Sequence, residues 1–345
     1  MKITISLVFT LFLIVSCDET KNKPEEKEEG KETVTVVEET VDHEKKLADL
    51  ERQLASDPDN SKLLTERALL LMRINRLDEG FSDMSKAFRL DSLDLDVRKA
   101  HGDYMLAMTR VLAARKDYNY VIENDPSNAQ AYLGMARTYA IEDYYEKAFE
   151  FADEALKRDK FLRDAYELKG LMFRAQNKTE LAISSYQTAV EMDPDFYSGF
   201  IALGNLFEQK NDPIAYEYYK AAHEIDTAGL EALHGMALFL QYHNGETEAK
   251  DLYRKILEYD STYFIAYYNQ GWIKLVLENE MDSATYFFER TLEIVPNYAD
   301  AWYNLGLSQV EKNNRNKAIE CFKNVLKINP EYKGAQEQIN DLLKL

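Results

Sequence analysis

The chain has 345 residues, of which 46% are hydrophobic and 30% are charged, and its formal net charge is −19. A surface this acidic is repelled by phosphate backbones and by anionic lipid headgroups. The composition therefore argues against nucleic acid as a partner, and against attachment to a membrane through basic patches.

The N-terminus reads as an export signal. Lys2 precedes an apolar run over residues 3–15, and Ser16 and Cys17 follow it. A charged start, a short apolar stretch and a small residue before the cleavage point are typical of secretory signals. The run is shorter than the ~20 residues that a transmembrane helix needs. An ordinary secretory signal, in which the cysteine is incidental, remains an alternative to the more specific interpretation that follows.

Because a cysteine directly follows the small residue, residues 1–16 resemble a bacterial lipoprotein signal. The resemblance implies cleavage before Cys17, which would become the first mature residue and carry the lipid anchor. A disulfide with the other cysteine, Cys321, would then be impossible. We expect Cys321 to be a packing residue.

A tether is expected over residues 17–41. The segment is rich in Glu, Lys and Thr and has few apolar residues, so it cannot offset the entropy of ordering. We expect it to be disordered and to span on the order of 25–30 Å. Residues 42–60, with Leu47, Leu50 and Leu54, are expected to form a lone capping helix.

Small residues recur along the rest of the chain with an almost constant period. Successive members are separated by 34, 34, 34, 34, 33, 34 and 35 residues. They are Ala68, Gly102, Ala136, Gly170, Gly204, Ala237, Gly271 and Gly306. Such a period marks one supersecondary unit stacked eight times, which is a solenoid.

A second series of alanines divides each unit into two helices. Ala114, Ala148, Ala182, Ala249 and Ala318 each follow their partner in the first series by 12 residues. This distance accommodates the end of helix A, a tight turn and the start of helix B. The spacing is 11 from Gly204 and 13 from Gly271. We expect both changes to fall in the turn between the helices.

The run Ala301-Trp302-Tyr303-Asn304-Leu305-Gly306, followed by Ala318, Phe322 and Pro330, resembles the tetratricopeptide repeat (TPR) family. The resemblance implies an all-α, right-handed superhelical solenoid of about eight helix-turn-helix hairpins with capping helices at both ends. The repeats would occupy residues 61–332, as units 61–94, 95–128, 129–162, 163–196, 197–229, 230–263, 264–298 and 299–332. Residues 333–345 would form the C-terminal cap, with Ala335, Ile339, Leu342 and Leu343 on its apolar face.

Catalysis is not expected. The five histidines form no His-x-x-x-His pair and none lies in metal-ligand spacing with a cysteine. Neither a glycine-rich phosphate loop nor a Gly-x-Ser-x-Gly elbow is present. Signal, tether, repeats and caps together account for every residue. We therefore predict no enzyme activity, no cofactor and no metal site.

In TPR proteins the A helices line a concave groove. The resemblance predicts that the C-terminal part of this groove binds a peptide segment of a partner, because aromatic side chains are favoured anchors at interfaces. Asn269 and Asn304 occupy matching places, and such an asparagine ladder binds peptide backbone in some relatives. The expected groove residues are Ile201, Asn205, Leu238, Tyr242, Tyr268, Asn269, Trp272, Tyr303, Asn304 and Leu307. The alternative is that Tyr268, Trp272, Tyr303 and Leu307 pack on one another and leave no open site.

Together these features predict a lipid-anchored scaffold or assembly factor of the bacterial cell envelope. Its partners would be other envelope proteins, its lipid would sit in a membrane, with the outer membrane favoured, and the solenoid would lie in the periplasm or at the cell surface. The alternative function is a lipoprotein that captures glycans or nutrients. Such relatives carry long insertions, and the regular spacing of this chain favours the scaffold. The oligomeric state is left open.

Overall fold

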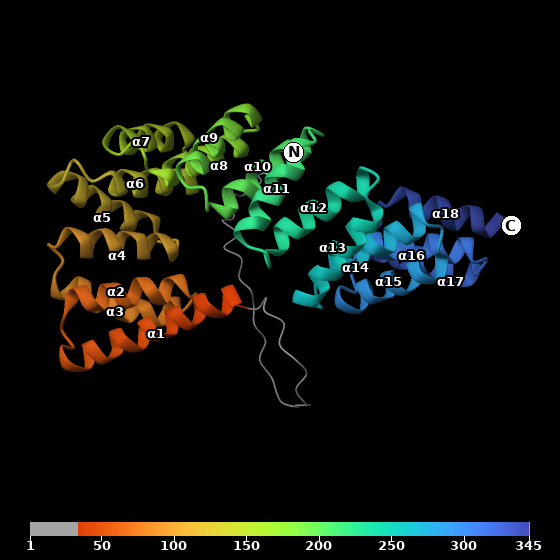
Figure 1. The fold of residues 1–345 in the computed structure, drawn as a ribbon, viewed down its shortest axis with the longest axis horizontal. Coiled ribbons are helices and arrows are strands. Elements are labelled where there is room, and N and C mark those ends of the chain that lie inside the picture. Colours follow the sequence, from red (N-terminus) through yellow and green to blue (C-terminus); the bar gives the residue numbers. More distant parts are fainter. Residues whose placement is uncertain (1–33, 345) are drawn as a thin grey trace. The chain divides into compact units, whose positions relative to one another are not determined.

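The computed structural model describes residues 34–344, and their side chains from residue 43. The expected signal peptide, Cys17 and most of the tether lie outside the described residues. Over the described part the chain is built of helices and short turns (Figure 1). It forms two compact units, one up to Thr188 and one from Ala189. Each unit is described by itself.

The first unit begins with one long helix and continues as helix pairs. Its helices are α1 (Val34–Ser56), α2 (Ser61–Arg73), α3 (Leu77–Leu90), α4 (Leu95–Ala107), α5 (Val111–Asn124), α6 (Ala129–Ile141), α7 (Tyr145–Arg158), α8 (Arg163–Ala175) and α9 (Thr179–Met192), the last of which crosses into the second unit.

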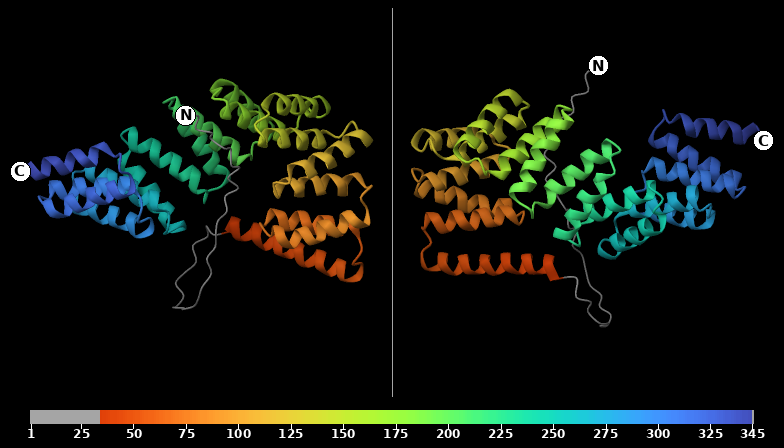
Figure 2. Two further views of the ribbon diagram at one scale, coloured as in Figure 1. Left: turned by 180° about the vertical axis from the view of Figure 1, so that it is seen from behind. Right: turned by 45° about the horizontal axis from the view of Figure 1, so that its top comes forward.

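The second unit continues the same pattern and ends in a single helix (Figure 2). Its helices are α10 (Tyr197–Gln209), α11 (Ile214–Ile225), α12 (Leu230–Tyr242), α13 (Glu246–Tyr259), α14 (Phe264–Trp272) with the π-helical turn η1 (Ile273–Leu277), α15 (Met281–Ile294), α16 (Ala299–Glu311), α17 (Arg315–Ile328) and α18 (Lys333–Lys344). Even-numbered helices from α2 to α16 are the A helices of eight hairpins, so the predicted all-α solenoid is confirmed. None of the described helices is long and apolar enough to cross a bilayer.

The end helices differ in detail from the prediction. Helix α1 begins at Val34, so residues 34–41, which we expected to be disordered, are helical. It ends at Ser56 rather than at residue 60, because Pro58 disfavours helical backbone at the residue before it. Leu343 of the C-terminal helix α18 is 63% exposed, not part of the apolar face. Its neighbour Leu342 occupies that face, and consecutive helical residues point about 100° apart.

Each hairpin turn contains one residue in the left-handed region, with φ between 53° and 60°. These residues are Asn75, Thr109, Asp143, Asn177, Asn211, Asn244, Asn279 and Asn313. Asparagine adopts this conformation more readily than most residues, because its side chain bonds locally. The following residue closes the turn by donating back into helix A, as from Lys178 N to Phe173 O at 2.9 Å. Seven of the eight turns are therefore Schellman caps, and in the turn after residue 277 the closing bond runs from Glu280 N to Lys274 O, one residue further back.

The two irregular hairpins absorb their length changes in different places. In the shorter one, Asn211 lies seven residues after Gly204, as in regular repeats, so the missing residue falls just after the turn. In the longer one, Asn279 lies eight residues after Gly271. The extra residue is therefore taken up inside helix A as the π-helical turn η1, where Glu278 N bonds Ile273 O. The expectation that it falls in the turn is wrong.

The glycines among the periodically recurring small residues are explained by aromatic rings on helix B. A Cβ atom on Gly204 or on Gly235 would lie 2.5 Å from the ring of Tyr219, which is fully buried between them. The same arrangement places Tyr118 between Gly102 and Gly134 in the first unit. Each ring thus joins the A helix of its own hairpin to that of the next one, and only glycine leaves room for it.

Candidate binding surface on the A helices of the second unit

One face of the second unit is formed by positions 2, 5, 9, 12 and 13 of its A helices, counted from the first helical residue. These positions recur on one side of a helix, because they are separated by three or four residues or by two full turns. We call this the A-helix face. Its members are Ser198, Ile201, Asn205, Glu208 and Gln209 on α10; Glu231, His234, Leu238, Gln241 and Tyr242 on α12; Ile265, Tyr268, Trp272, Leu275 and Val276 on α14 and η1; and Asp300, Tyr303, Leu307, Val310 and Glu311 on α16.

Two aromatic side chains on this face form what we call the aromatic corner. The rings of Tyr242 and Trp272 lie 5.7 Å apart between centroids and are tilted by 59°. Tyr242 is 62% exposed, whereas Trp272 is half-buried because it also packs on the core around Leu233 and Ile273. Val276, on the π-helical turn, is 53% exposed. The corner therefore presents apolar surface to solvent on a rigid helical support.

Polar groups also lie on the A-helix face. The Tyr219 hydroxyl lies 2.7 Å from Asn205 Oδ1 and 2.7 Å from Glu208 Oε2. A hydroxyl donates only one hydrogen bond, so it donates to the carboxylate, and the Asn205 amide donates to it in the flipped orientation. The Tyr253 hydroxyl donates to Gln241 Oε1 at 3.0 Å.

Several predicted groove residues contact other residues of the repeats and so are not available to a partner. Burial raises the pKa of Tyr253, and a hydrogen bond from the buried Asn269 side chain partly offsets this rise. Asn304 Nδ2 donates to the Tyr268 hydroxyl at 3.0 Å, and the Tyr268 ring contacts Tyr298 at 5.0 Å between centroids. Both asparagines of the expected ladder therefore bond tyrosines of the preceding repeat.

The predicted residues nearest the C-terminal cap also pack internally. The Tyr303 ring lies 5.5 Å from that of Phe322 and 5.0 Å from that of Tyr332. Leu307 packs on the core that α18 closes, and Ile201 and Leu238 are half-buried. Among the predicted residues, Asn205 and Tyr242 are exposed, and Trp272 is half-buried beside Tyr242. Sequence analysis did not single out Glu208 and Gln241. Each follows a predicted groove residue by three positions, Asn205 and Leu238 respectively, so the helical period could have indicated them.

Several charged side chains on the A helices of the first unit form ion pairs with one another. Lys99 Nζ lies 2.7 Å from Asp103, which also accepts from the Tyr118 hydroxyl at 2.8 Å. Arg137 bonds Asp164 at 3.1 Å. These groups are paired by their own neighbours, so this surface offers fewer free charges to a partner.

Glu167, on α8, is a half-buried carboxyl near the Arg137–Asp164 pair. Burial raises the pKa of its carboxyl, and the Asp164 carboxylate raises it further, while Arg163 and Arg137 oppose the rise. A carboxyl whose pKa is higher in the folded chain than in the unfolded chain costs stability once it is ionised, that is, above both pKa values. The cost disappears below the unfolded pKa, near about pH 4.

We therefore expect Glu167→Gln to raise the melting temperature at pH 8 and to leave it nearly unchanged at about pH 4. Thermal unfolding of both proteins at the two pH values measures this. The exposed Glu150→Gln on α7 is the matched control, and it should change neither value. An equal gain at both pH values would contradict the assigned cause.

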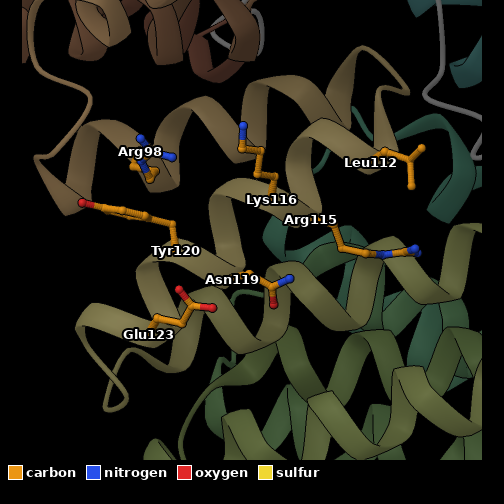
Figure 3. A pocket seen from close by; sticks show the side chains of 7 residues that line it. All are labelled: Arg98, Leu112, Arg115, Lys116, Asn119, Tyr120 and Glu123. Atoms are coloured by element: carbon orange, nitrogen blue, oxygen red, sulfur yellow. The ribbon is translucent and has the colours of Figure 1, made fainter.

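A shallow depression of about 430 Å³ lies on the first unit, on helices α4 and α5 (Figure 3). Its lining is Arg98, Leu112, Arg115, Lys116, Asn119, Tyr120 and Glu123. Both arginines are already engaged: Arg98 lies over the Tyr120 ring at 3.9 Å, and Arg115 bonds Glu142 at 2.5 Å. The depression is therefore a feature of surface packing, and we assign no ligand to it.

The described residues offer little chemistry for catalysis. They contain no group of three or more His, Cys, Asp or Glu side chains that could hold a metal ion. Burial lowers the pKa of His234 and of His223. Burial also raises the pKa of the Cys321 thiol to about 12, which makes it a poor nucleophile, as expected for a packing residue.

Comparison with known families matches three stretches of the repeats. The family described as tetratricopeptide repeat matches residues 99–162 and 299–332, and that described as TPR repeat matches residues 170–211. These matches fall within the hairpins described above. They agree with the resemblance drawn from the recurring small residues and the motif around Gly306.

Similar proteins share the fold at low identity. The C-terminal part of a TPR repeat-containing protein from Cytophaga hutchinsonii has a TM-score of 0.58 and 18% identity, and the match covers 69% of this chain and 98% of that one. The APC/C hetero-tetramer Cut9–Hcn1 gives a TM-score of 0.56 and 19% identity, over 87% of this chain and 60% of that one. Identities this low establish the fold alone.

Among curated proteins, the human protein O-mannosyl-transferase TMTC1 is 23% identical over 167 residues. The match covers 47% of this chain and only 19% of the relative. That relative bears an enzyme's name, but this chain spans less than a fifth of its length. The absence of catalysis in this chain stays a prediction.

Proposed function

We propose that this chain, three stretches of which match tetratricopeptide repeat models, is a membrane-anchored scaffold or assembly factor of the bacterial cell envelope. In this proposal Cys17 carries the lipid, the segment after it tethers the repeats, and the A-helix face of the second unit binds a peptide segment of another envelope protein. Stacked repeats favour this role because they provide extended surfaces for partners.

The observation that carries the proposal is the aromatic corner. An exposed tyrosine beside a tryptophan on a rigid helix supplies a large contact area at little entropic cost, and such residues dominate binding energies at interfaces. Glycan or nutrient capture is the weaker candidate. The hairpins contain no inserted segment that would build an enclosed ligand pocket, since their turns are of nearly constant length.

Crosslinking and affinity purification of the tagged protein from its own membranes test the binding part of the proposal. We expect a specific envelope protein with the native chain and its loss with Tyr242→Ala. The control is Tyr286→Ala, which removes a tyrosine of similar exposure, 55%, from helix α15 outside the A-helix face. Equal capture by all three proteins would contradict a partner site at the aromatic corner.

Lipid attachment needs a separate experiment. Metabolic labelling with an alkyne fatty acid should mark the native chain, and Cys17→Ser should abolish both the label and membrane retention. The Cys321→Ser variant should keep both and serves as the matched control. A labelled Cys17→Ser chain would rule out this anchor.

A further inference from the structure

The A-helix face of the second unit is charged with one sign only. It holds the carboxylates of Glu208, Glu231, Asp300 and Glu311, and no lysine or arginine. Within the described residues none of the four forms an ion pair with a lysine or arginine, although three accept hydrogen bonds from tyrosines of the stack, namely Glu208 from Tyr219, Glu231 from Tyr197 and Asp300 from Tyr332. The negative charges on this face are therefore not neutralised by the chain itself.

The aromatic corner also lacks an internal cation. In the first unit, arginines of the same chain lie over several tyrosine rings, as Arg158 lies 3.6 Å from the centre of the Tyr132 ring and Arg115 lies 4.0 Å from that of Tyr139. No described lysine or arginine covers the ring of Tyr242 in this way. Aromatic faces attract cations through their quadrupole, so a ring left open beside carboxylates favours a positive ligand.

Glu208 places a carboxylate on α10, the helix next to α12 of the aromatic corner. Its Oε2 atom accepts from the Tyr219 hydroxyl at 2.7 Å, which fixes the side chain on α10. Helices α10 and α12 are in direct contact. A carboxylate on α10 therefore lies on the helix next to the one that carries Tyr242.

We propose that Tyr242 and Trp272 bind the side chain of a lysine or arginine in the partner segment, that the Glu208 carboxylate on the adjacent helix attracts its charge, and that Val276 contacts an adjacent apolar residue of that segment. The proposal rests on the proposed function, since it specifies the chemistry of the segment that the same face binds. The carboxylate supplies charge, and the rings supply cation–π attraction and apolar contact for the aliphatic stem. The partner segment is thus apolar with a basic residue, and not purely apolar.

Selection of random dodecapeptides displayed on phage by the purified full chain tests this chemistry without knowledge of the partner. We expect enriched peptides to combine aromatic or aliphatic residues with lysine or arginine. Replacing that basic residue by citrulline or norleucine in a synthetic copy should weaken binding about tenfold, and raising the salt concentration should weaken it as well.

The variants Glu208→Gln and Tyr242→Ala should each weaken binding of the selected peptides about five- to tenfold. Glutamine still accepts from the Tyr219 hydroxyl, so the first variant removes charge and little else. Glu289→Gln and Tyr286→Ala, both on α15, are the controls and should bind as the native chain does. If the enriched peptides contained no excess of basic residues, or if both variants bound the selected peptides as tightly as the native chain does, the cation site would be overturned. Peptide binding by this face would then still stand. Enrichment of no peptide would overturn both proposals.

Discussion

Gly235→Leu is expected to destabilise the second unit by at least about 3 kcal/mol, because an isobutyl group has to enter a place that the Tyr219 ring already fills. A Cβ atom alone would lie 2.5 Å from this ring, closer than real contacts allow. The ring cannot move aside, since Gly204 on the other side is equally close. Urea unfolding followed by circular dichroism measures the loss.

A second substitution separates overpacking from other effects. Tyr219→Ala alone should cost about 3–5 kcal/mol through the cavity that it leaves. In the Gly235→Leu background the same change removes the clash, so the double variant should be clearly more stable than the sum of the two losses predicts. Additive losses would show that the ring is not what excludes a side chain at this position. Gly334→Ala on α18 is a control, because its Cβ would meet only the far end of the Tyr303 side chain, at 3.1 Å.

The repeat fold was accessible from the sequence because its determinants are local and recur. A glycine such as Gly204 and a ring such as Tyr219 lie within one hairpin, so their pairing repeats with the period of the chain. The same holds for the asparagines at the turns. The position of the extra residue in the irregular hairpin was not accessible, since a looser turn and a π-helical turn both accommodate one residue.

The candidate site was only partly accessible, because exposure on the A-helix face depends on the next repeat. Tyr242 and Tyr268 look alike in sequence, each on an A helix among apolar residues. Asn304 of the following repeat bonds the hydroxyl of Tyr268, and Tyr298 covers its ring. Tyr242 contacts Trp272 through tilted rings and stays exposed. Such pairings between repeats follow no period, so a single repeat does not reveal them.

A buried charge network in the first unit leads to the second large expected effect. The Asp117 carboxylate, on α5, is 3% exposed and lies 2.6 Å from His101 Nδ1 and 3.4 Å from the Arg98 guanidinium. The ring of Phe88 stacks on His101 at 4.0 Å between centroids. Repeat 1 carries the equivalent pair, in which Arg67 bonds Asp83. Removing one member of a buried charge pair leaves the other without compensation.

Asp117→Leu is therefore expected to destabilise the first unit by about 3–5 kcal/mol, measured as the shift of the urea unfolding curve. Replacing the whole network by apolar side chains, with Arg98→Met and His101→Leu added, should recover most of this loss, because no buried charge then remains unpaired. The exposed pair of Arg290 and Glu293 on α15 is the control, and Glu293→Ala should cost less than about 0.5 kcal/mol. If the triple variant were no more stable than Asp117→Leu alone, packing around the leucine, and not the unpaired charge, would be the cause of the loss.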